Sequence, residues 1–199
     1  MRKLLLALSL LLVGWGALHA WRHRTYTPPP GVLAPDAPEQ VNLANGAQLS
    51  RGDFTLTTRA HYALTARVLA RADYRFDPGA ALAPEDLALG WGRMSDSNVL
   101  ATIEISQLQR FYYWQVKAFP IPAHEIETSS ANTHMIPADA AVRAAMERVR
   151  VGELVHLEGF LVDASRADGW QWHTSMTRDD TGNGACELMY VESLSIIDP

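Results

Sequence analysis

One cysteine and seven histidines are the side chains of this sequence with the clearest potential for chemistry. Cys186 follows a glycine-rich turn and opens an apolar segment. A cysteine nucleophile needs a nearby base and a lowered pKa, so a hydrolase or transferase would use Cys186 with His134 or His173 as its base. Two other interpretations stay open, a buried inert thiol and an intermolecular disulfide. An intrachain disulfide is excluded because the chain has a single cysteine.

Residues 124–137, HEIETSSANTHMIP, gather imidazole and carboxylate groups in a segment that we predict to be a loop. His124, Glu125 and His134 are of the types that bind zinc, so we take them as candidate metal ligands and expect no other cofactor. The segment lacks the second histidine of an HExxH motif. Two alternatives remain. His134 could act as a general base oriented by Asn132 or by a glutamate, or the polar groups of the loop could bond its own backbone.

Trp170 and Trp172 are separated by one residue, so both indoles point to the same face of a predicted strand. Paired aromatic rings on a sheet surface can stack on a sugar ring or a peptide, which makes these two residues a candidate ligand surface. The alternative is that both indoles pack in the core.

The elements that must position these residues are mostly strands. In residues 61–76, apolar side chains at even-numbered positions alternate with mostly polar and charged ones, which predicts a long half-buried strand. A single soluble helix is predicted, with Pro137 at its first position and Gly152 at its end. Further strands are predicted at 87–93, 102–118, 152–162, 169–176 and 186–197.

The predicted order is three strands, one helix and then two to three strands. We therefore expect a mainly β protein with one helix, of the α+β class. A helix between the third and fourth strands of a small curved β-barrel resembles the order of the OB-fold, and Gly159 within a strand suits such curvature. The resemblance is one of element order only, and another β-rich roll or sandwich is the alternative.

The charge distribution argues against nucleic acid as a partner. The chain has a formal net charge of −5, with 17 basic and 22 acidic residues. Residues 1–24 contain four of the basic residues and no acid, so residues 25–199 carry −9. Binding to DNA or RNA depends on neutralising phosphates, for which an acidic domain is unsuited.

The N-terminus has the form of a signal anchor or a signal peptide. Arg2 and Lys3 precede an uncharged stretch, residues 4–21, whose length is at the lower end of a membrane span. We expect an N-terminal hydrophobic helix here that contacts the membrane. The expected divisions are a signal anchor or signal peptide (1–24), a Pro-rich extracytoplasmic linker (25–50) and one β-rich globular domain (51–199).

These observations predict a single-pass protein of the bacterial inner membrane with its C-terminal domain in the periplasm. Signal cleavage, giving a secreted or periplasmic protein, is the alternative. We expect a non-enzymatic binding module for an envelope protein or a small ligand. The alternatives are a Cys/His-dependent hydrolase or transferase and a metal-binding domain around His124 and His134.

Overall fold

The computed structural model describes residues 9, 12–14, 16, 24–178, 180, 182 and 184–198. The predicted N-terminal hydrophobic helix, residues 4–21, therefore lies mostly outside the described residues. Among the residues that are described, none belongs to a helix with both the length and the apolar composition of a membrane span.

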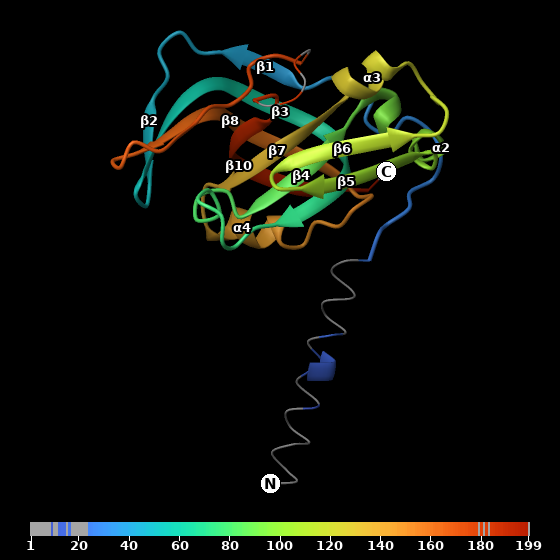
Figure 1. The fold of residues 1–199 in the computed structure, drawn as a ribbon, viewed down its shortest axis with the longest axis horizontal. Coiled ribbons are helices and arrows are strands. Elements are labelled where there is room, and N and C mark those ends of the chain that lie inside the picture. Colours follow the sequence, from blue (N-terminus) through green and yellow to red (C-terminus); the bar gives the residue numbers. More distant parts are fainter. Residues whose placement is uncertain are drawn as a thin grey trace.

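The protein is mostly β with few helices, which confirms the predicted β-rich class (Figure 1). The strands are β1 (Glu39–Asn42), β2 (Gln48–Arg51), β3 (Phe54–Asp73), β4 (Glu85–Gly90), β5 (Ile103–Leu108), β6 (Phe111–Val116), β7 (Ser130–Pro137), β8 (Leu154–Arg166), β9 (Gln171–Trp172) and β10 (Glu187–Ile197). The helices are η1 (Gly92–Ser95), α2 (Ser97–Leu100), α3 (Ala123–Thr128) and α4 (Ala140–Met146). The prediction of one helix missed η1, α2 and α3, which are too short to show a helical periodicity.

In the described part of the chain, eight strands form one sheet, and five of them close a ring of hydrogen bonds. The order around the ring is β3, β4, β7, β10 and β8, and β8 pairs back to β3. The β7–β10 pair is parallel, whereas the other four pairs of the ring are antiparallel. Strands β1 and β2 both pair with β3, and β9 pairs with β8.

The long strand β3 carries the alternation that the sequence predicts. Tyr62, Leu64 and Val68 are buried, as expected for the apolar face of residues 61–76. The strand begins earlier than predicted, at Phe54, and two register shifts interrupt its pairing with β8 and β4. Such irregularities increase the local bend and twist of a strand, which helps β3 to pair with both neighbours.

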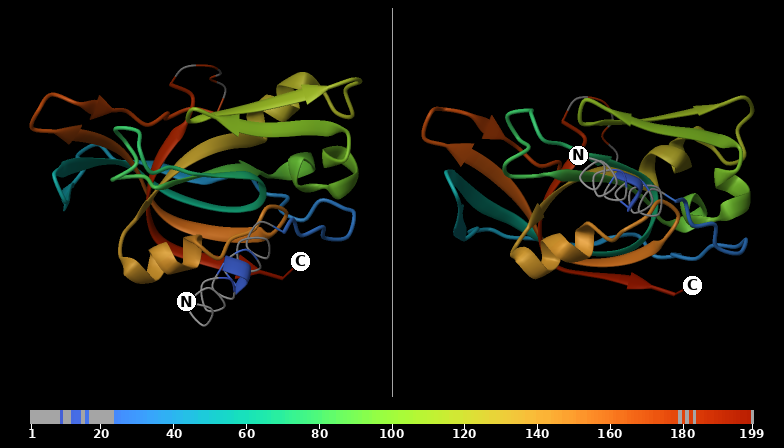
Figure 2. Two further views of the ribbon diagram at one scale, coloured as in Figure 1. Left: turned by 60° about the horizontal axis from the view of Figure 1, so that its bottom comes forward. Right: turned by 90° about the horizontal axis from the view of Figure 1, so that it is seen from below.

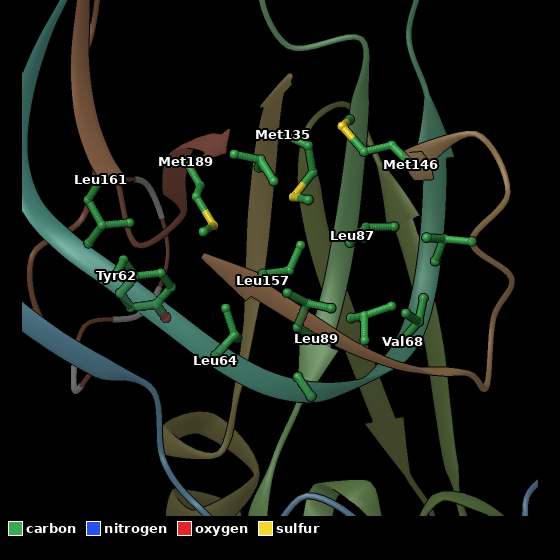
Figure 3. Packing of buried hydrophobic residues seen from close by; sticks show 14 of the residues in the cluster. Tyr62, Leu64, Val68, Leu87, Leu89, Met135, Met146, Leu157, Leu161 and Met189 are labelled. Atoms are coloured by element: carbon green, nitrogen blue, oxygen red, sulfur yellow. The ribbon is translucent and has the colours of Figure 1, made fainter. Parts of the chain in front are cut away.

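The main hydrophobic core lies inside the ring. Side chains from β3, β4, β7, β8 and β10 meet there, among them Tyr62, Leu87, Met135, Leu157 and Met189 (Figure 3). Val142 and Met146 of α4 join the same cluster.

Helix α4 differs from the predicted helix at both ends. Its N-cap is Asp139, whose side chain accepts a hydrogen bond from the Val142 N–H at 2.8 Å. Pro137 is therefore not its first residue, and instead ends β7. The helix stops at Met146, well before Gly152.

A separate hairpin, β5–β6, covers the outer face of β4, on the opposite side of the ring from α4 (Figure 2). Its inner face packs on a cluster that includes Ala88, Met94 and Ile126. The prediction of a single strand at 102–118 is wrong, because Gln109 and Arg110 form a tight turn within it.

The segment 124–137 was predicted to be a loop and instead forms α3 and β7. Asn132, Thr133 and His134 are all buried, so β7 lacks the apolar–polar alternation by which a strand is recognised. Among the later strands, 152–162 and 186–197 correspond to β8 and β10, whereas the predicted strand 169–176 is reduced to β9.

Candidate functional site

The predicted catalytic and ligand-surface residues meet in one pocket. Its volume is about 610 Å³, and its lining includes Cys186, His134, His173, Trp170 and Trp172. Four segments that are distant in the sequence supply the walls: the β3–β4 loop, the turn of the β5–β6 hairpin, β7, and the β8–β10 connection with β9. This volume is in the range of small-molecule sites.

His134 is held against a buried carboxylate. The pairing of β4 with β7 sets Asp86 opposite His134, and the Asp86 side chain is 0% exposed. Asp86 Oδ2 lies 2.9 Å from His134 Nδ1, although the two atoms are not aligned as a hydrogen bond. A carboxylate this close favours a proton on Nδ1 and leaves Nε2 as an acceptor. Among the described residues, Nε2 has no hydrogen-bond partner.

Arg110 joins the hairpin turn to the same carboxylate. Its Nη1 donates to Asp86 Oδ1 at 2.7 Å, and its Nη2 lies 2.9 Å from each oxygen of Asp77. The guanidinium also stacks 3.6 Å above the centre of the Tyr74 ring. Both turn residues have left-handed backbones, with φ of 53° at Gln109 and 72° at Arg110, which costs roughly 1–3 kcal/mol each for a residue other than glycine. The contacts of Arg110 offset this cost.

The charged groups of the pocket are already paired. Asp77 and Asp86 share the single guanidinium of Arg110, and His173, which is mostly exposed, lies 3.5 Å from Asp163. A phosphate or carboxylate entering the pocket would find the Arg110 charge neutralised and a second carboxylate nearby. The arrangement therefore suits an uncharged ligand better than an anion.

Cys186 carries a protonated thiol. The Asn132 amide donates to its Sγ at 3.7 Å, and the thiol donates to the Arg110 carbonyl at 3.8 Å. Burial, the largest cause, raises the pKa of Cys186 to about 12, and the Asn132 hydrogen bond opposes it. A cysteine nucleophile needs a lowered pKa, so this environment gives the nucleophile hypothesis no support.

The two tryptophans are part wall and part core. Both are half-buried against the cluster that contains Phe54 and Leu56, and their rings meet edge to face at 5.8 Å. The Trp172 ring lies 4.5 Å from the His134 ring and rests on Gly79, where an added Cβ would be 2.5 Å from Trp172 Cζ3. Trp170 and Trp172 therefore line the pocket, as the predicted ligand surface requires, and also pack partly in the core, as the alternative requires.

The candidate zinc ligands are not all brought together. His124 and Glu125 lie on α3, where Glu125 pairs with Arg93, whereas His134 lies in the pocket. In the part of the chain that the structure describes, no group of three or more His, Cys, Asp or Glu side chains is arranged to hold a metal ion.

The sequence interpretation missed Asp86 and Arg110. Asp86 directly precedes the predicted strand 87–93 and looks like part of its preceding turn. For Arg110 the sequence did contain a signal. The residues of the hairpin that face the cluster have odd numbers before the turn, as at Ile103 and Ile105, and even numbers after it, as at Tyr112. Such a change of parity marks a turn even when the turn lacks glycine and asparagine.

Comparison of the chain with protein-family models, with curated proteins and with solved structures gave no match. The geometry of the pocket is therefore the basis on which we assign a function.

Proposed function

We propose that this protein is a non-enzymatic binding module of the cell envelope. Residues 4–21 anchor it in the bacterial inner membrane, and the domain binds a small uncharged ligand in the periplasm. If the signal is cleaved, the same domain is released as a periplasmic or secreted protein. The pocket that joins His134, Trp172 and Cys186 is the observation that carries the binding assignment.

We further propose that the ring of strands is an OB-like barrel. In chain order the strands of the ring are β3, β4, β7, β8 and β10, so α4 lies between the third and the fourth of them, which supports this assignment. In OB-folds the loops after the first and fourth strands flank the ligand site. Here the corresponding connections contribute Asp77 and Trp172 to the pocket.

The ligand that this pocket suits best is a neutral sugar ring. Indole and imidazole rings offer apolar contact to the faces of a sugar, and His134 Nε2 offers an acceptor to a hydroxyl group. The paired charges of Arg110, Asp77 and Asp86 disfavour an ionic ligand. Sugars are also available outside the cytoplasm, where we place the domain.

A second candidate is a Cys/His-dependent hydrolase or transferase. The presence of Cys186 and His134 in one pocket, with the buried Asp86 beside His134, favours it. The raised pKa of the Cys186 thiol opposes it, and we therefore rank it behind the binding module.

The test is a titration of the folded protein with neutral disaccharides, with sugar phosphates and with polyamines. Tryptophan fluorescence is the signal that reports binding. We expect saturable changes with neutral sugars only. His134→Asn retains an N–H near Asp86 but removes Nε2, and should weaken binding by about three- to tenfold, the value of one hydrogen bond. His156→Asn, outside the pocket, is the matched control. Preferential binding of phosphates or polyamines would rule out the neutral-ligand assignment.

A further inference from the structure

The segment that follows the predicted membrane anchor is fixed to the domain along most of its length. We call residues 26–34 the strap. They lie within the predicted Pro-rich linker and run beside η1 and α2 (Figure 2). Pro28 and Ala34 are buried, although most of their neighbours in the strap are partly or fully exposed.

Three consecutive residues, Ser95 to Ser97, bind the strap through their side chains. Ser95 Oγ accepts from the Leu33 and Ala34 N–H groups at 3.0 and 3.1 Å. Asp96 Oδ1 accepts from the Gly31 N–H at 3.0 Å, which lowers the pKa of Asp96. Ser97 Oγ donates to the Pro28 carbonyl at 2.9 Å.

A buried arginine supports this contact from beneath. Arg67 of β3 is 6% exposed, and its Nη1 donates to Ser97 Oγ at 2.8 Å and to the Ser95 carbonyl at 3.1 Å. The strap therefore rests on a polar cluster that is itself anchored to the ring of strands.

The N-terminal end of the strap is joined to the turn between α4 and β8. The Tyr26 N–H donates to the Val151 carbonyl at 2.8 Å. Gly152 allows this approach, because a Cβ at that position would lie 1.7 Å from the Tyr26 carbonyl oxygen. The left-handed backbone of Gly152, with φ of 94°, further restricts this position to glycine.

The short spacing from the anchor to Tyr26 limits where the domain can lie. The stretch 4–21 ends five residues before Tyr26, and five extended residues span at most about 17 Å. A free linker of 25–50 would instead let the domain turn in any direction. Because the strap is bound from Tyr26 onward, a membrane surface at residue 21 would lie within this distance of Tyr26, which is bonded to the turn 147–153.

We propose that the turn 147–153 forms a lipid-facing surface that rests on the phospholipid headgroups. This inference depends on the membrane anchor of the proposed function. Arg24 and Arg148 are exposed, and anionic headgroups attract such cations, whereas the exposed Glu147 of this turn is paired with Arg143.

Strand β4 connects the strap to the surroundings of the pocket. The Gly92 N–H, just after the end of β4, donates to the Ala34 carbonyl, and Asp86, near the start of β4, lies beside the pocket residue His134.

The experiment uses the full chain in vesicles of phosphatidylethanolamine and phosphatidylglycerol, with a headgroup spin-labelled lipid as quencher. Arg148→Cys and Asp53→Cys, each in a Cys186→Ser background, receive the same fluorophore. Both sites are exposed. Asp53 directly precedes β3, whereas Val68, whose carbonyl accepts from the Gly152 N–H, lies toward the other end of this strand. We expect quenching at position 148 to be at least threefold stronger than at position 53.

A Gly-Ser insertion of about 12 residues between Arg24 and Thr25 is the matched variant. It alters no contact of the strap but adds about 20 Å of flexible reach, and it should lower quenching at position 148 to the level of position 53. Equal quenching at both sites in the uninserted, membrane-bound chain overturns the inference. A chain that stays out of the vesicle fraction overturns the anchor itself, so the two failures are distinguishable.

Discussion

At the scale of single residues, the chemistry of the pocket depends on which side chains contact one another, and the type of a residue does not predict its contacts. Cys186, His134 and Trp172 could be selected from the sequence because few side chains have their chemistry. Their partners come from a neighbouring strand, for Asp86, and from the turn of the hairpin, for the Arg110 carbonyl. They become neighbours only when β4 pairs with β7 and the hairpin packs on the ring. The state of the thiol follows from those partners and from burial, which is why the sequence left it open.

The reactivity of Cys186 is the prediction at this scale. Because burial raises the pKa of the thiol to about 12, alkylation of the folded protein should be slow at neutral pH and should accelerate only well above the ordinary value of about 8.5. The measurement is the alkylation rate against pH, with the urea-unfolded chain as control. Cys186→Ser should change the free energy of unfolding by less than about 1 kcal/mol, since a hydroxyl can make both hydrogen bonds. A midpoint below about 8.5 would favour the hydrolase or transferase.

At the scale of elements, the hairpin β5–β6 is attached to the ring through its turn as well as its inner face. The Arg110 side chain enters the pocket wall, and the Asn132 amide donates to the Arg110 carbonyl at 3.0 Å. The sequence predicted strand character at 111–116 correctly, from its aromatic residues. It missed the turn because Gln109-Arg110 has none of the residues that favour left-handed backbones, and contacts made elsewhere stabilise that conformation.

Removing Arg110 should therefore release the hairpin. Arg110→Ala leaves Asp86 buried beside His134 without its guanidinium, and loss of one partner of a buried pair costs about 3–5 kcal/mol. We expect a lower midpoint in urea unfolding and faster amide exchange in β5 and β6. Arg143→Ala, which breaks an exposed pair with Glu147 on α4, is the control and should cost about 0.5 kcal/mol or less. Equal effects of the two variants would show that Arg110 does not hold the hairpin.

At the scale of the whole molecule, buried carboxylates tie outlying segments to the ring. Arg71 reaches from β3 to Glu85 and to carbonyls at the end of α4, and Arg178 of the β9–β10 connection pairs with Glu187. The sequence predicted the order of most strands and the position of α4. The expectation of a small curved barrel came from element order alone, because the β3–β8 and β7–β10 pairings that close the ring join residues far apart in the chain and leave no local pattern.

These carboxylates give the molecule a pH-dependent stability. Burial, the largest cause, raises the pKa of Glu85 to about 8 and of Glu187 to about 7, despite the opposing effects of Arg71 and Arg178. Both values lie above those of unfolded glutamate, so between about pH 4.5 and 8 the folded protein holds protons that the unfolded chain has lost. Asp96 and Glu125, whose pKa values are lowered, affect stability only at more acidic pH.

The free energy of unfolding should therefore fall as pH rises from 5 to 8, by up to about 1.4 kcal/mol per pH unit for each titrating group. Urea unfolding of residues 25–199 at several pH values measures the slope. Glu85→Gln and Glu187→Gln replace each acid with a neutral side chain of the same shape, so each variant should have a flatter profile. Glu104→Gln, at an exposed position of β5, should keep the parent slope. If the free energy of unfolding of the unsubstituted domain rose with pH over this range, Glu85 and Glu187 would not be buried protonated carboxyls. The contacts by which Arg71 and Arg178 hold the outlying segments to these two residues would then be wrong as well.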